Sequence, residues 1–193
     1  MKIILASQSP RRREILTLME LPFEVIESHV EEVPPVDATT EDLVKALAQQ
    51  KARAVFDRHP QDCVIGADTV VDLDGRVLGK PHTPERAKEY LGLLQGRSHI
   101  VYTGICVMTP GRVDVRSVRT DVTFRPMTAE EIDWYVGTGD PLDKAGSYGV
   151  QGPASLFVDH LEGNYFNIIG MPAPTLYEML LDAHVIDRQH RVL

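Results

Sequence analysis

Residues 63–75 read CVIGADTVVDLDG, an apolar run that ends in a turn signal. The run predicts a buried strand over residues 64–72, and DLDG predicts the turn that ends it. Val77 and Leu78 follow the turn closely and favour a hairpin back onto the same strand. This stretch therefore sets the centre of the predicted sheet.

Asp68 interrupts the apolar pattern of this strand. A buried carboxylate without a partner costs several kcal/mol, so Asp68 needs a cation, a metal or hydrogen bonds. That requirement makes it a candidate functional residue. The alternative is an aspartate at a strand end that binds nearby backbone N–H groups.

The flanking sequence mixes predicted strands and helices irregularly, which favours an α/β class with a mixed sheet. Further strands are expected at residues 2–6, 23–26, 100–108, 113–124 and 156–161. Helices are expected at residues 10–19, 40–58, 83–96, 128–136 and 172–181, the second of them capped by Thr40. Residues 29–38 and 137–152 are predicted loops, because the first is acidic with two prolines and the second is glycine-rich.

Length and composition restrict the class of protein. The chain has 193 residues, of which 43% are hydrophobic and 25% charged, as in soluble globular proteins. We expect one domain over residues 1–186, a polar tail over 187–193, and a cytoplasmic location without a membrane span. The net charge of −8 disfavours binding to a nucleic-acid polymer but allows a small anion in a local basic pocket.

Residues 5–16, LASQSPRRREIL, place three arginines at the predicted start of a helix. Free N–H groups in the first helical turn and forked guanidinium groups both favour binding of a phosphate. Successive residues point about 100° apart, so Arg11 and Arg12 are expected to face inward and Arg13 to face solvent. The alternative is a capped surface helix with solvated arginines.

Other patterns are weaker when taken alone. Glu31 and Glu32 offer the hard oxygen ligands that Mg²⁺ prefers, and taken alone they are better explained as solvated loop charges. GRVLGKP (75–81) fails as a P-loop, because only three residues separate its glycines and a proline replaces Ser or Thr. AGSYG (145–149) has the form of a nucleophile elbow around Ser147, but it follows polar residues and not a strand.

Six segments together resemble the Maf family of nucleoside triphosphate pyrophosphatases, also called septum formation inhibitor proteins. They follow the family's order between residue 2 and about residue 183: LASQSPRR (5–12), EE (31–32), KA (51–52), GADTVV (66–71), GKP (79–81) and DKAGSYGVQG (143–152). The resemblance implies the α/β fold of the inosine triphosphate pyrophosphatases, with a long mixed sheet flanked by helices and two lobes around a deep cleft. It also implies hydrolysis of a nucleoside triphosphate to monophosphate and pyrophosphate, house-cleaning of nucleotide pools, a link to septum formation, and a homodimer.

The resemblance assigns roles to single residues by motif matching. Asp68 corresponds to the family's proton acceptor. Ser7 and Arg12 correspond to phosphate-binding residues, and Lys51 and Lys80 correspond to residues that act in catalysis.

The resemblance also implies a divalent cation, Mg²⁺, Mn²⁺ or Co²⁺, with Glu32 and Asp68 as its ligands. Glu31 stands where many members carry aspartate, so the choice between Glu31 and Glu32 stays open. Asp68 stays open as base, metal ligand or both.

Three positions bear on the substrate. One branch of the family prefers dTTP and UTP and carries SPRR, GADTVV and KAGxYGxQG, whereas another prefers 7-methyl-GTP and carries SPWR, GSDQV and AGSFxxEG. Arg11, Thr69 and Gln151 stand at the three diagnostic points, so this sequence looks like the dTTP/UTP branch. Gln151 offers a donor and an acceptor and Arg11 offers donors, which together suit the edge of thymine or uracil.

Two other functions remain as alternatives. The first is a non-catalytic, nucleotide-binding regulator of septum formation, although pure binding would not require Asp68 as a base. The second is a serine hydrolase that uses Ser147.

Overall fold

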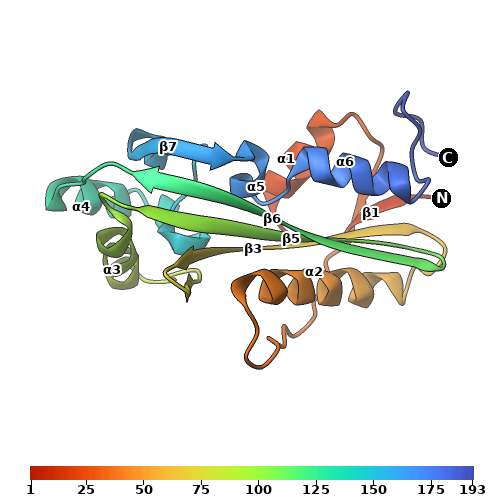
Figure 1. The fold of residues 1–193 in the computed structure, drawn as a ribbon, viewed down its shortest axis with the longest axis horizontal. Helices are drawn as coiled ribbons and strands as arrows, with labels where there is room; N and C mark the ends of the chain where they lie inside the picture. The colour runs from red at the N-terminus through yellow and green to blue at the C-terminus, as the bar shows by residue number, and fades with distance from the viewer. The chain divides into compact units, whose positions relative to one another are not determined.

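The computed structural model describes residues 1–193 and divides the chain into two compact units. Unit 1 comprises Met1–Asp68, Thr103–Val118 and Gly170–Leu193, and unit 2 comprises Thr69–Tyr102 and Arg119–Ile169. Three long strands contribute residues to both units: β3 (Cys63–Leu73), β5 (Ser98–Thr109) and β6 (Arg112–Phe124) (Figure 1). The deep cleft and the domain boundary at residue 186 stay predictions.

The strands form a seven-stranded sheet in the order β2-β1-β3-β5-β6-β7, with β4 (Arg76–Leu78) paired to β3. β1 (Ile3–Leu5) pairs in parallel with β2 (Glu24–Val25) and with β3. The β3–β4 and β6–β7 pairs are antiparallel, and β7 spans Val158–Gly163. This confirms the α/β class with a mixed sheet, and the hairpin predicted after DLDG places Val71 opposite Leu78.

Unit 1 contains three helices: α1 (Pro10–Leu18), α2 (Thr40–Phe56) and α6 (Ala173–Asp182). In Figure 1, α2 lies along one face of the strands of unit 1, while α1 and α6 lie on the opposite side. The predicted cap of α2 is wrong by one residue, because the side chain of Thr39, not Thr40, accepts the N–H of Asp42. Both Thr39 and Thr40 carry the hydroxyl that a helix cap uses, but Thr39 is the extended residue that precedes the helix and Thr40 is already helical.

Small residues allow α2 to pack closely on the sheet of unit 1. Ala48 and Ala52 join Ile4, Val64 and Cys106 in a fully buried cluster. Gly66 on β3 lies directly against this helix, since a Cβ added there would overlap the Ala48 carbonyl oxygen and stand 2.7 Å from the Ala52 nitrogen. Residues 48–52 of α2 are therefore held close to the centre of β3.

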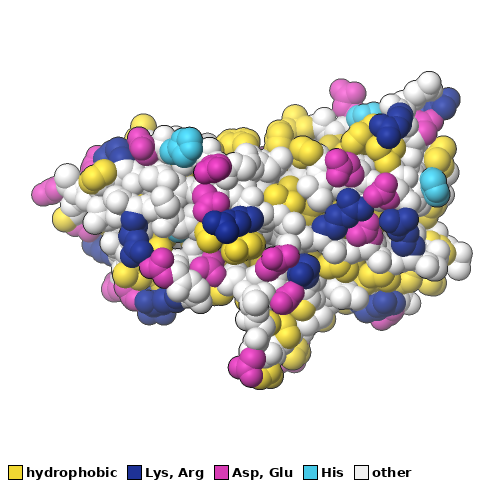
Figure 2. All heavy atoms as spheres, in the orientation of Figure 1, with side chains coloured by type: hydrophobic (Ala, Val, Ile, Leu, Met, Phe, Trp, Pro, Cys, Tyr) yellow, Lys and Arg dark blue, Asp and Glu magenta, His cyan; other side chains and the backbone are white.

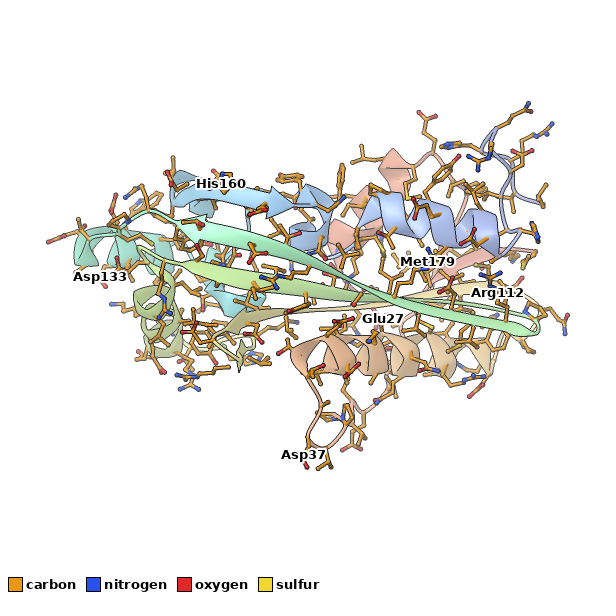
Figure 3. The ribbon with its side chains drawn as sticks, in the orientation of Figure 1. Glu27, Asp37, Arg112, Asp133, His160 and Met179 are labelled. Atoms are coloured by element: carbon orange, nitrogen blue, oxygen red, sulfur yellow. The ribbon has the colours of Figure 1, made fainter.

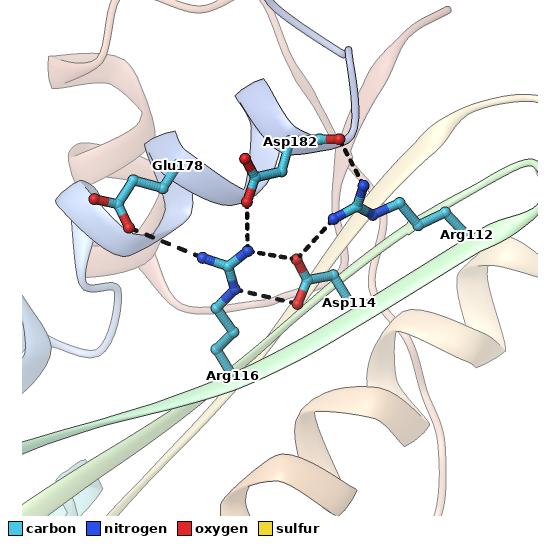
Figure 4. A network of polar contacts seen from close by, with 5 residues as sticks. All are labelled: Arg112, Asp114, Arg116, Glu178 and Asp182. Carbon is cyan, nitrogen blue, oxygen red and sulfur yellow. Dashed lines mark hydrogen bonds and ion pairs between the residues drawn. The ribbon is translucent and has the colours of Figure 1, made fainter.

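An ion-pair network connects α6 to β6 within unit 1 (Figure 4). The Arg116 guanidinium lies 2.8 Å from Asp114, 2.7 Å from Asp182 and 3.9 Å from Glu178. Arg112 donates 2.6 Å to the main-chain oxygen of Asp182, so it satisfies a carbonyl at the C-terminal end of the helix. The hydrogen bonds that Arg116 donates to Asp114 and Asp182 raise the pKa of Arg116, which keeps this cation charged.

Unit 2 contains the helices α3 (Pro84–Leu94), α4 (Ala129–Gly137) and α5 (Tyr165–Ile169). The predicted loop 137–152 is more ordered than expected, because it holds two short 3₁₀ turns, at Asp140–Asp143 and Ala145–Ser147. A third 3₁₀ turn, at Pro153–Leu156, delays the start of β7 by two residues relative to the predicted strand. The helix α5 is not predictable from the sequence pattern, because it has only five residues and hence little periodicity.

The residues that follow α6 turn back on themselves. Ile186 forms an antiparallel bridge with Val192, and the N–H of Leu193 donates 2.9 Å to the oxygen of Val185.

On the face drawn in Figure 2, acidic and basic side chains are interspersed and not gathered by sign. None of the helices has both the length and the hydropathy that crossing a bilayer requires.

A buried histidine in unit 2 makes stability depend on pH. His99 is 3% exposed, and its Nε2 lies 2.7 Å from the Tyr148 hydroxyl. Its ring also makes T-shaped contacts with the Phe124 and Tyr148 rings. Burial lowers the pKa of His99 from 6.5 to about 4, so the folded protein holds this ring neutral.

We expect the free energy of unfolding to fall as the pH drops from 6.5 towards 4, by roughly 3 kcal/mol from this group. In that window the unfolded chain binds a proton that folded His99 does not accept, so acidification favours unfolding. Urea unfolding at several pH values measures the slope. His99→Gln removes the titrating ring and should flatten the profile; an unchanged slope would contradict the assignment.

Candidate active site

The motif LASQSPRRREIL (5–16) places a helix N-terminus shortly after the end of β1. Ser9 caps α1, since its Oγ accepts the N–H of Arg12 at 3.4 Å, and Pro10 occupies the first helical position. Arg11 and Arg12 are half-buried and Arg13 is exposed, which agrees with the predicted orientations.

Arg12 is held by two partners, one distant in the chain and one five residues away. Its Nε donates 2.8 Å to the main-chain oxygen of Gly170, and its Nη1 donates 3.3 Å to the hydroxyl of Ser7. Ser7 is 7% exposed and also accepts the N–H of Ser9 at 3.1 Å. The structure thus brings together the two residues predicted to bind phosphate.

Lys51 brings together the two predicted metal ligands. Its Nζ lies 2.5 Å from Oδ1 of Asp68 and 2.9 Å from Oε1 of Glu32. The side chains of Lys51 and Asp68 are 14% and 12% exposed, whereas that of Glu32 is 45% exposed. Asp68 lies in the middle of β3 and is paired with a cation, so the alternative of a strand-end aspartate does not apply.

Arg12 also interacts electrostatically with Asp68 and Glu32. Burial lowers the pKa of the Arg12 guanidinium, while the negative charges of Asp68 and Glu32 act in the opposite direction. The positive charge of Arg11 adds to the lowering. An anion bound here would offset the burial of Arg12, which is what a phosphate site requires.

Asp72 shows what a structural aspartate on the same strand looks like. It is 6% exposed, and its Oδ1 accepts the N–H of Gly75 at 2.8 Å across the turn that follows β3. Gly75 has a φ of +82°, a conformation that glycine adopts without strain. Asp72 therefore serves the DLDG turn, in contrast to Asp68.

The remaining predicted residues belong to unit 2. Thr69 follows Asp68 directly on β3 and is half-buried, while Lys80 and Gln151 are exposed. The segment that carries Lys80 is hydrogen-bonded to the glycine-rich motif DKAGSYGVQG (143–152), because the N–H of Gly146 donates 3.1 Å to the oxygen of Gly79.

Lys144 of this motif makes contacts that were not predicted from the sequence. Its Nζ donates 2.7 Å to the main-chain oxygen of Asp140, and it also lies 3.0 Å from the Asp140 carboxylate and 2.8 Å from that of Asp143. Tyr135 donates 2.7 Å to the other Asp140 oxygen, and burial together with this bond raises the pKa of Tyr135. The spacing of Asp140 and Lys144, four residues apart within a glycine-rich loop, is the signal that would have found this pair.

Comparison with known proteins decides the family. The sequence model of the Maf-like protein family matches residues 2–183. The chain belongs to the Maf family.

Two curated relatives of this Maf protein, from Bacillus cytotoxicus and Bacillus mycoides, bear the name dTTP/UTP pyrophosphatase. Each is 49% identical over 179 residues, which cover 93% of this chain and 94% of the relative. Among solved structures, a HAM1 protein from Coxiella burnetii matches with a TM-score of 0.54 at 17% identity, over 94% of this chain and 99% of that one. The structural match supports the predicted fold.

The donor set of this Maf protein suits a hard divalent cation. No group of three or more His, Cys, Asp or Glu side chains is placed to hold a metal ion. The candidate ligands are therefore Glu32 and Asp68, the two carboxylates that both contact the Lys51 ammonium. Mg²⁺ sites commonly use one or two carboxylates and complete their shell with substrate phosphates and water, so this pair fits.

Ser147 of the Maf motif does not have the geometry of a nucleophile. Its side chain is fully buried, its Oγ has no hydrogen-bond partner, and its backbone has a φ of +66° within a 3₁₀ turn. A nucleophile elbow exposes its serine between a strand and a helix. The structure therefore disfavours the serine-hydrolase alternative.

Proposed function

We propose that this protein hydrolyses dTTP and UTP to the nucleoside monophosphate and pyrophosphate. The observation that carries the proposal is the convergence of Lys51, Asp68 and Glu32 within electrostatic reach of Arg12. The name of relatives about half identical to this chain supports the same reaction and the same substrates.

The reaction requires a water molecule to attack the α-phosphorus. The new bond joins the water oxygen to that phosphorus, and the bond to the bridging oxygen breaks, so pyrophosphate leaves with the electron pair. Asp68 accepts the proton of the attacking water, and Lys51 holds its carboxylate in place. Arg12, oriented by Ser7 and Gly170, binds the phosphates, and Lys80 adds positive charge.

A divalent cation, Mg²⁺, Mn²⁺ or Co²⁺, when held by Glu32 and Asp68, supplies further neutralisation of the triphosphate and makes water easier to deprotonate. Arg11, Thr69 and Gln151 are proposed to set the preference for the base. The family resemblance also supports a homodimer, a cytoplasmic location, house-cleaning of nucleotide pools and a link to septum formation.

The test is pyrophosphate release by the purified protein from dTTP, UTP, GTP and 7-methyl-GTP in competition. We expect dTTP and UTP to be consumed first, because a site built to hydrogen-bond one base edge rejects a mismatched edge. Nucleotide binding without pyrophosphate release would favour the regulatory alternative. Faster hydrolysis of either guanine nucleotide would overturn the proposed preference.

Activity is expected to require a divalent cation and to depend on Glu32 more than on Glu31. Glu32→Ala removes a carboxylate that contacts the same Lys51 ammonium as Asp68, so more Mg²⁺ should be needed for half-maximal activity, by about 10-fold or more. Titration of chelated enzyme with Mg²⁺ measures this. Glu31→Ala is the matched control, and a larger shift in that variant would exchange the two assignments.

A further inference from the structure

Glu32 lies on a segment without helix or strand. Residues 26–39 connect β2 to α2, and most of their side chains are exposed, including Val36 at 89%. Figure 3 shows this segment protruding beside the start of α2, with Asp37 at its outer end. A side chain on such a segment needs a specific support before it can serve as a metal ligand.

Gln50 supplies a support at the residue that follows Glu32. Its Nε2 donates 2.7 Å to the main-chain oxygen of Val33, and its Oε1 accepts the N–H of Val33 at 2.9 Å. The amide thus pairs with both main-chain groups of one residue, as a neighbouring strand would. Only Asn and Gln carry a carbonyl acceptor and an NH₂ donor side by side in one neutral amide, so few substitutions could replace it.

Gln50 and Lys51 act on neighbouring residues of the segment. Gln50 binds the main chain of Val33, while Lys51 lies 2.9 Å from the carboxylate of Glu32. Both belong to the part of α2 that packs closely on Gly66, two residues before Asp68 on β3. Rigid helix geometry therefore sets where Glu32 lies relative to Asp68.

We infer that Gln50 is a positioning residue that holds Glu32 at the metal and triphosphate site. The inference rests on the proposed function for its consequence in catalysis. Gln50 has two separable effects here: it orders the backbone at Val33, and this order is needed for binding of the cation.

Gln50→Ala tests both effects, with Gln49→Ala as the matched control on the exposed side of the same helix. Backbone order is measured by hydrogen exchange in a peptide that covers residues 31–35. Pro34 and Pro35 have no N–H, so residues 31–35 contain only three exchanging amides, Val33 among them, in a peptide that begins before residue 31. We expect exchange about 10-fold faster in Gln50→Ala and unchanged in Gln49→Ala.

Cation binding is measured by titration of the nucleotide-free protein with Mn²⁺ alone, followed by dTTP kinetics. We expect Gln50→Ala to weaken Mn²⁺ binding by about 3- to 10-fold and to raise the Mg²⁺ needed for activity, with kcat at saturating Mg²⁺ changed little. Gln50→Glu keeps the acceptor for the Val33 N–H but sets a carboxylate oxygen against the Val33 carbonyl. It should therefore also speed exchange, and it tests the claim if the alanine variant folds poorly.

The outcomes separate this inference from the proposed function. Unchanged exchange in the Gln50 variants overturns the claim of backbone order. Faster exchange with unchanged Mn²⁺ affinity overturns the positioning role, even if the parent protein cleaves dTTP. If the parent protein releases no pyrophosphate, the proposed function fails, while exchange and Mn²⁺ binding still decide the role of Gln50.

Discussion

Asp68→Asn is expected to lose about 10²–10⁴-fold in turnover of dTTP while keeping its fold. The amide cannot accept the proton of the attacking water, and the loss corresponds to about 3–5.5 kcal/mol of barrier. The fold should persist because Lys51 keeps a second counter-ion, Glu32, at 2.9 Å. Pyrophosphate release at saturating dTTP and Mg²⁺ measures the effect, and circular dichroism checks the fold.

Asp72→Asn is the matched control for this prediction. Asp72 lies on the same strand and is also buried, and an asparagine oxygen can still accept the Gly75 N–H. We expect turnover close to that of the parent protein. Comparable losses in both variants, or near-normal turnover of Asp68→Asn, would contradict the role of Asp68.

Gly104→Ala is expected to destabilise the protein by about 3 kcal/mol or more. The added Cβ would overlap the Val44 carbonyl group and stand 2.7 Å from the Lys45 nitrogen, which are main-chain atoms of α2. A helix backbone cannot move aside as a flexible side chain can, so the helix must shift away from β5. Urea unfolding measures the change.

Gly92→Ala controls for the substitution itself. Gly92 lies within α3, and no atom stands within 4 Å of an added Cβ. Alanine is the better helix former, so this variant should gain about 0.5–1 kcal/mol. Equal effects at residues 92 and 104 would show that the close contact between β5 and α2 is not needed for stability.

Local pattern was enough to predict most elements of the fold. The apolar run with its DLDG turn predicted β3 and its hairpin, and Ser9-Pro10 predicted the start of α1. These signals work because capping, turns and strand burial depend on neighbours within a few residues. The five residues of α5 and the 3₁₀ turns within 140–147 were too short to carry such a signal.

The apolar pattern of β3 was also enough to show that Asp68 needs a partner, since a carboxylate in an apolar strand must be compensated. That this partner is Lys51, 17 residues away, and that Glu32 shares it, is seen only in the folded chain. The same holds for the contact of Arg12 with Gly170 across 158 residues and for that of Gln50 with Val33. The physical reason is that such contacts depend on which faces of α2, β3 and the helix termini meet in the folded chain, and no spacing along the sequence encodes that meeting.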